Sequence, residues 1–221
     1  MQPRFALSSI EDLLLAMSPA SSYRFARLMA FFAVLEASGC AMQPVELPSN
    51  VVQSRGPQGE AYIDKVDFSY ARTTSTDFGK LKLCIAENVQ HNETNLHDSA
   101  GSFVGRYTGT YYQTDHRQVI GGGQVFKLVD DASAVLIATG VTIVPPSGMA
   151  LSPEYVRYEL KTSAKDKQVG LTFFSITRAQ QNSGILSNNG FQSVGIWPGS
   201  RASDVYASLE RIANKIKNCL N

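Results

Sequence analysis

The sequence has little of what identifies a function at once. Its net charge is only +1, with 20 basic against 19 acidic residues, so no strong field favours binding to nucleic acid. Its longest apolar run, 28–35, is far shorter than the roughly 20 residues of a membrane-spanning helix. It is nevertheless 43% apolar and 10% aromatic, enough for a packed core. A length of 221 residues suits a single domain.

Residues 24–40 have the three parts of an export signal. Two arginines, Arg24 and Arg27, precede the apolar run 28–35, and small residues then lead directly to Cys40. We therefore expect the first 39 residues to be a signal peptide.

A cysteine directly after small residues resembles the lipobox of bacterial lipoproteins. In that family the cysteine receives lipid, palmitate among the acyl chains, and becomes the mature N-terminus. Ser38 and Gly39 fit the family pattern, whereas Glu36 and Ala37 depart from it. The resemblance implies lipidation at Cys40 and work outside the cytoplasm.

Two neighbouring features refine this expectation. The resemblance implies sorting to the outer membrane, on its periplasmic side, because Ala41 is not the aspartate that usually retains such proteins in the inner membrane. Residues 1–16 carry Glu11 and Asp12, which do not suit a signal, so we expect translation to start at Met17.

Two other interpretations of the segment remain open. Ordinary cleavage after residues 37–39 would leave a soluble periplasmic protein with an N-terminal cysteine. Alternatively, the apolar run is a buried helix of a cytosolic protein that is never processed.

The cysteine count agrees with lipidation. An exported protein with three cysteines would normally keep one unpaired. If Cys40 takes lipid, Cys84 and Cys219 can form a disulfide in an oxidising compartment. Both lie on apolar helical stripes, so two unpaired core cysteines are the alternative.

After the signal we expect a tether and then one domain. Residues 40–60 are rich in Pro and Gly without hydrophobic period and predict a flexible tether. The domain covers 61–221. Its first strand spans 62–70, with Tyr62, Val66, Phe68, Tyr70 and also Asp64 on one face.

Two helices and several strands are expected in the domain. The helices cover about 77–89, capped by Ser75 or Thr76, and about 202–219, capped by Ser200 or Ser203. Residues 90–101 and 179–199 are expected to be loops. The strands are expected at 102–107, 109–113, 124–129, 134–144, 155–162 and 169–177, with turns at Asp130-Asp131 and 165–167.

This order of elements predicts an α+β fold, in which two helices pack on one face of an antiparallel sheet of about five to seven strands. A fold of this class does not by itself indicate a function.

Candidate chemistry is sparse. His91, Glu93, His97 and Asp98 cluster within eight residues, but their spacing matches no usual metal signature. The glycines 121–123 precede a strand rather than a helix, which favours a turn over a phosphate-binding loop. We expect no metal and no cofactor.

Two aromatic segments are candidate binding surfaces. Tyr107 and Tyr111 alternate onto one face of a predicted strand near Arg117, which suits a glycan or lipid headgroup. Phe191 and Trp197 lie in a long loop rich in Asn and Gly that either binds a ligand or covers the core.

The favoured function is a non-enzymatic envelope lipoprotein that binds a protein, glycan or lipid partner, with a membrane anchor and no nucleic-acid partner. The alternative is a periplasmic hydrolase, since catalytic triads assemble from distant positions although no serine here lies in a nucleophile motif.

Overall fold

The computed structural model describes residues 45–72, 77–148 and 150–221, all within a compact unit that spans Gln43–Asn221. The predicted signal segment, 24–40, and the predicted cap residues Ser75 and Thr76 lie outside the described residues.

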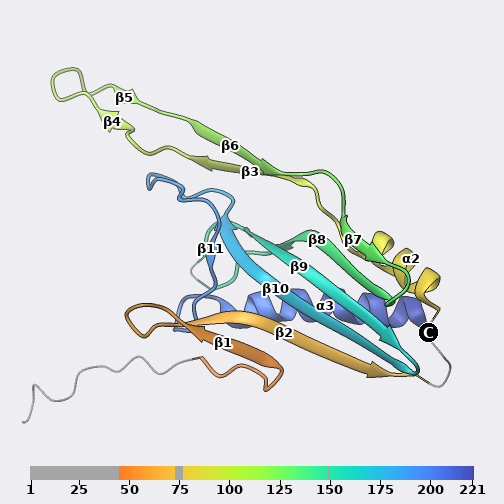
Figure 1. The fold of residues 1–221 in the computed structure, drawn as a ribbon. Helices are drawn as coiled ribbons and strands as arrows, with labels where there is room; N and C mark the ends of the chain where they lie inside the picture. The colour runs from red at the N-terminus through yellow and green to blue at the C-terminus, as the bar shows by residue number, and fades with distance from the viewer. Residues whose placement is uncertain (1–44, 73–76, 149) are drawn as a thin grey trace, which may run out of the picture. The chain divides into compact units, whose positions relative to one another are not determined.

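A seven-stranded antiparallel sheet forms the centre of this unit (Figure 1). The strand order is β1-β2-β10-β9-β8-β7, with β11 paired to β10. The strands are β1 (Val51–Arg55), β2 (Ala61–Ala71), β7 (Phe126–Asp130), β8 (Val135–Val144), β9 (Glu154–Lys165), β10 (Gln168–Gln180) and β11 (Gln192–Ser193).

The longest hairpin, β9–β10, follows directly from its sequence. Val156, Tyr158 and Leu160 on alternate positions of β9 are buried, while intervening charged residues face outward. The two strands pair from Gln168↔Lys165 onward, as the charged turn predicts.

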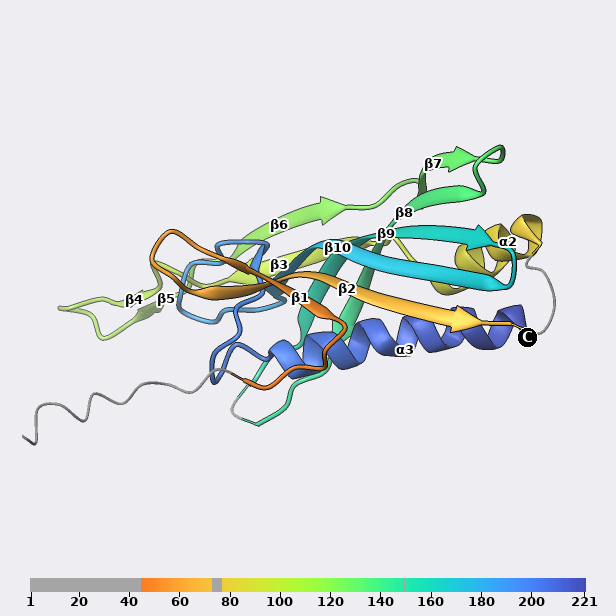
Figure 2. The same cartoon turned by 60° about the horizontal axis from the view of Figure 1, so that its bottom comes forward.

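Two helices cover one face of the sheet, α2 (Phe78–Asn88) and α3 (Ala202–Leu220), which confirms the predicted α+β class. Figure 2 shows α3 running along the sheet. Its inward stripe is fully or largely buried and joins the core: Val205, Leu209, Ile212 and Ile216. Each such side chain contributes about 1.5–3 kcal/mol on burial. In the part of the chain described, no helix is long and apolar enough to span a bilayer.

The helix caps differ from the prediction. Asp77 caps α2, because its carboxylate accepts a 2.8 Å hydrogen bond from the Gly79 N–H. Arg201 occupies the N-cap of α3 in the left-handed conformation, with φ of 61° and no side-chain cap bond. The expected cap Ser200 instead accepts a hydrogen bond from the Trp197 N–H.

The predicted alternation on β2 fails at one residue. On β1, neighbours Val52 and Gln53 pair with Lys65 and Ile63, so Asp64 is an extra residue on β2. This bulge changes which residues face the core. Ile63 is therefore buried, whereas Tyr62, expected on the same face as Val66, contacts Trp197 instead.

A second bulge interrupts β10. The pairing with β9 shifts between Phe174 and Thr177, and Ser175 adopts a positive φ of 51°. Ile176, rather than Ser175 as the simple alternation predicts, is buried. Opposite this region Gly140 faces Tyr158, and a Cβ there would lie 2.4 Å from the Tyr158 hydroxyl.

The expected tether over 40–60 is wrong for its second half. Val51–Arg55 is strand β1, paired with β2 through a tight turn in which Gly56 donates to the Glu60 carbonyl. Val45 and Leu47 also pack against the core. The Pro and Gly residues that suggest a tether belong in part to this hairpin.

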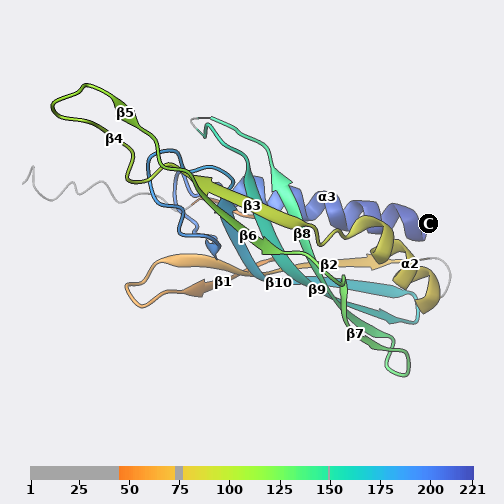
Figure 3. The same ribbon diagram turned by 90° about the horizontal axis from the view of Figure 1, so that it is seen from above.

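Part of the expected loop over 90–101 is a strand, Glu93–Asp98, and His116–Gly121 is a strand that the sequence pattern does not predict. We call residues Glu93–Gly121 the arm. Its base is a ribbon of β3 (Glu93–Asp98) and β6 (His116–Gly121), and its tip is a ribbon of β4 (Phe103–Val104) and β5 (Tyr111–Tyr112). Figure 3 shows the arm extending past the end of the sheet, away from the C-terminus. Its polar sequence conceals these strands because most of their residues are solvent-exposed.

Candidate functional site

The base of the arm is fixed to a loop that follows β10. The backbone N–H groups of His97 and Ser99 donate to the carbonyls of Gln181 and Gly184, at 2.8 and 2.6 Å. The Asp98 carboxylate accepts from the N–H groups of Asn188 and Ala100, each at 3.0 Å. These bonds, first that from Asn188, lower the pKa of Asp98 and connect the arm to the body.

The tip of the arm carries an exposed aromatic cluster. Phe103 stacks on Tyr112 with ring centroids 5.0 Å apart, and Val104 pairs with Tyr111. Tyr107 is 94% exposed in the turn between the strands. We call these five residues the tip cluster.

The tip is held together by its own polar groups. Gly105 donates to the Thr110 carbonyl, and Gly109 donates back to the Gly105 carbonyl, both at 2.8 Å. Below the tip, the Thr114 N–H donates to the Ser102 hydroxyl. This closed turn presents the aromatic rings without support from the sheet.

Three of the residues predicted for binding lie along the arm. Tyr107 and Tyr111 share the tip, but Tyr107 belongs to the turn and not to the strand face that the alternation predicts. Arg117 lies on β6 and pairs with Asp115 at 2.9 Å, away from the tip.

The other two predicted residues, Phe191 and Trp197, lie over the sheet. The Arg157 guanidinium stands 4.4 Å from the centre of the Phe191 ring. Trp197 meets Tyr62 edge to face at 5.5 Å and packs over Gly195, whose added Cβ would lie 2.1 Å from the indole. The structure does not bring this pair together with the tip.

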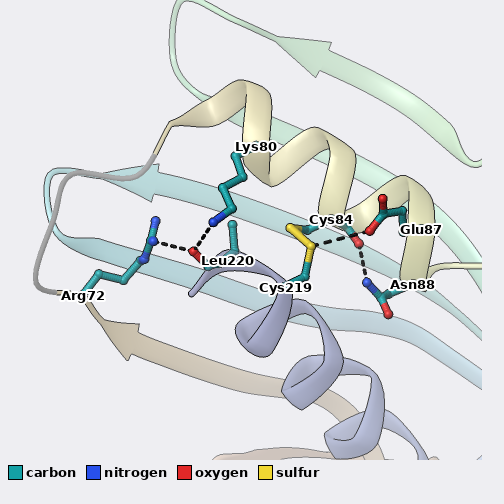
Figure 4. Close-up of a disulfide and its surroundings, with 7 residues drawn as sticks. All are labelled: Arg72, Lys80, Cys84, Glu87, Asn88, Cys219 and Leu220. Carbon is teal, nitrogen blue, oxygen red and sulfur yellow. Dashed lines mark hydrogen bonds between the residues drawn. A yellow bond between two sulfur atoms is a disulfide. The ribbon is translucent and has the colours of Figure 1, made fainter.

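The two cysteines of the unit form the predicted disulfide. Cys84 on α2 and Cys219 on α3 are bonded, with Cα atoms 5.7 Å apart (Figure 4). Arg72 and Lys80 both donate to the Leu220 carbonyl, at 2.5 and 2.8 Å, and so satisfy the end of α3.

A cleft of about 880 Å³ opens beside the loop after β10. Glu154, only 2% exposed, pairs with Arg178 at 2.6 Å and with Arg201 at 3.8 Å. Arg201 also contacts Asp204 at 2.9 Å and donates to the Pro145 carbonyl. The two carboxylates, Glu154 and Asp204, balance the charges of Arg178 and Arg201. The network connects the segment after β8 with β9, β10 and the start of α3.

The residues that cluster in the sequence, His91, Glu93, His97 and Asp98, are not gathered into one site. Among the residues described, no group of three or more His, Cys, Asp or Glu side chains is placed to hold a metal ion. His97 and Asp98 are adjacent on β3, so they point to opposite faces. His91 lies 3.1 Å from the Gln124 carbonyl.

A small cavity of about 270 Å³ at the arm base brings Asp98, His116 and Ser187 together. Both oxygens of Asp98 already accept backbone hydrogen bonds, and the His116 ring lies 3.2 Å from the Ala100 carbonyl. The sequence does not indicate that these three residues line one cavity, because they come from distant segments.

The comparisons add no functional information. No family model matches the chain, and no curated protein does. A solved structure of a DUF4468 family protein from Bacteroides ovatus ATCC 8483 is similar with a TM-score of 0.39 and 8% identity, over 78% of this chain and 85% of that one. A likeness at this level supports no argument about either fold or function.

Proposed function

We propose that this protein is a non-enzymatic lipoprotein of the bacterial outer membrane, anchored through Cys40 on the periplasmic side, which binds a partner through its arm. The observation that carries the proposal is the Cys84–Cys219 disulfide. It uses two of the three cysteines of the sequence and leaves Cys40 as the third.

The disulfide also supports export. Structural disulfides persist in oxidising compartments such as the periplasm and are rare in the cytosol. An acyl chain contributes about 0.8 kcal/mol for each CH₂ that it buries, so several chains on Cys40 would hold the protein firmly at the membrane.

The intact mass of the protein purified from its native bacterium tests the anchor. We expect a chain that begins at Cys40, carries acyl chains and keeps its disulfide. The matched Cys40→Ala variant should lose the acyl mass and leave the outer-membrane fraction. An unmodified chain that retains Met1 or Met17 would rule the proposal out.

The Asp98, His116 and Ser187 cavity is the observation that favours a hydrolase as second candidate. In this interpretation His116 is the general base for Ser187. Hydrolysis of chromogenic esters, compared between the wild type and His116→Ala, tests it. Equal rates would exclude this site.

A further inference from the structure

We infer that the tip cluster inserts into the headgroup region of the same lipid bilayer that holds the anchor. This inference rests on the proposed lipidation of Cys40 and identifies the partner of the arm as phospholipid. Phe103, Val104, Tyr107, Tyr111 and Tyr112 would form a second, non-covalent contact with the membrane.

The composition of the tip favours lipid. Between Ser102 and Thr114 the only charged residue is Arg106, and there is no acid. Tyrosine is enriched where membrane meets water, because its ring is apolar and its hydroxyl polar. A single cation beside the rings is complementary to the anionic headgroups of bacterial phospholipids.

The structure of the tip also favours contact with lipid. An isolated two-stranded hairpin is only marginally stable. Moving its exposed aromatic rings from water into an apolar environment would be favourable in free energy. Yet the arm base is bonded to the body through Ser99 and Asp98, so the tip is presented at a fixed place. The three ribbon views place the tip beyond the sheet (Figures 1–3).

A neighbouring loop shares this character. From Ala179 to Ser200 the chain contains no charged side chain, and Ile185 and Leu186 are strongly exposed. This is the loop to which the arm base is bonded. Neither the tip, 102–114, nor this loop contains an acidic residue that would repel the headgroups, whereas the arm base between them carries Asp98 and Asp115.

The length of chain between Cys40 and the folded unit limits how far the unit can stand from the membrane. Val45 already packs against the core, so only five peptide steps separate Cys40 from the folded unit. Fully extended, they span at most about 18 Å. A link of this length keeps the folded unit close to the bilayer.

Depth-dependent quenching tests the inference on the natural, acylated protein. Trp197→Phe removes the single tryptophan, and Tyr107→Trp then places a reporter in the tip. The matched control combines Trp197→Phe with Lys167→Trp in the β9–β10 turn, at the opposite end of the unit. Both are reconstituted into vesicles of phosphatidylethanolamine and phosphatidylglycerol, with and without brominated acyl chains.

We expect brominated lipid to reduce the emission of the tip reporter and shift it to shorter wavelength, with the control unchanged. Flotation and intact mass are measured on the same samples. A protein that floats but whose tip reporter is unquenched overturns the membrane contact alone. A protein without acyl chains that does not float overturns both proposals. Emission that shifts only at high protein density, without quenching, indicates a second copy as occupant and also overturns the inference.

Discussion

The backbone N–H of Asn188 donates a 3.0 Å hydrogen bond to Oδ2 of Asp98, 90 positions earlier in the sequence. The other carboxylate oxygen accepts from the Ala100 N–H. This side chain thus adds to the backbone bonds of His97 and Ser99 that connect the arm to the loop after β10.

Replacing this carboxylate should loosen the base of the arm. We expect Asp98→Ala to speed amide exchange in β3, β6 and at Asn188, because two N–H groups lose their acceptor. Hydrogen exchange with mass spectrometry measures it. Asp115→Ala, which removes only an exposed partner of Arg117, is the control and should leave Asn188 protected. Equal exchange in both variants would contradict the assigned role.

The Asp204 carboxylate should make stability depend on acid pH. The Ser147 hydroxyl, and then Arg201, lower the pKa of Asp204 in the folded state. A lowered pKa stabilises the fold fully above the unfolded value of about 3.9, and the effect disappears as pH falls through the folded value. Because the Asp204 side chain is 39% exposed and solvent screens it, we expect less than about 1 kcal/mol. Urea unfolding at neutral pH and at pH 3 should show a smaller difference in Asp204→Asn.

Loss of the disulfide should destabilise the unit substantially. The bond closes a separation of 135 residues, and cross-links of this kind contribute about 2–4 kcal/mol to the free energy of unfolding. The Cys84→Ala and Cys219→Ala double variant is compared with the wild type in urea. Wild type treated with reductant should approach the variant. Labelling of both thiols without reductant would show that the bond is absent.

The contact between Gly140 and Tyr158 gives a pair of opposite predictions. The Tyr158 hydroxyl is buried without a hydrogen-bond partner in the described part of the chain, and burial raises its pKa, so it stays neutral. Tyr158→Phe should therefore be neutral or stabilise by about 1 kcal/mol. Gly140→Ala should destabilise by about 1–3 kcal/mol, because its Cβ meets the Tyr158 ring. Thermal unfolding of the two variants separates these outcomes.

Glu154 should be the most sensitive charged residue. Glu154→Ala leaves the Arg178 and Arg201 side chains without their buried partner, which typically costs about 3–5 kcal/mol. Denaturant unfolding measures the loss. Glu159→Ala on the same strand is the control, since Glu159 pairs with Lys127 on the exposed face and should cost little. Equal losses would mean that burial of the network is unimportant.

The elements with a strong hydrophobic period could be predicted from the sequence. The stripe of α3, the β9–β10 hairpin and the inward position of Cys84 and Cys219 follow from periods of 3.6 and 2, and the structure has them. Both cysteines lie on core-facing stripes, so their pairing could be foreseen as well.

The arm and the bulges could not be predicted, for a physical reason. β6 buries little and so shows no apolar alternation in residues such as His116 and Arg117. β3 buries alternate residues, but Thr94 and Asp98 among them are polar, so its sequence lacks an apolar period. Bulges at Asp64 and Ser175 change the face of later residues without any sequence signal of their own. Tyr107 and Tyr111 were singled out from the sequence, but Phe103 and the isolation of these rings on an arm were not.

Because α3 follows every strand of the sheet in the sequence, it is synthesised after all of them. Every strand of the sheet leaves the ribosome before the helix that covers Tyr158, Leu171 and Phe173. Until Cys219 emerges, the sheet presents an apolar face and Cys84 an unpaired thiol, both open to aggregation and wrong pairing. The risk of aggregation and of wrong pairing therefore lasts until α3 is complete.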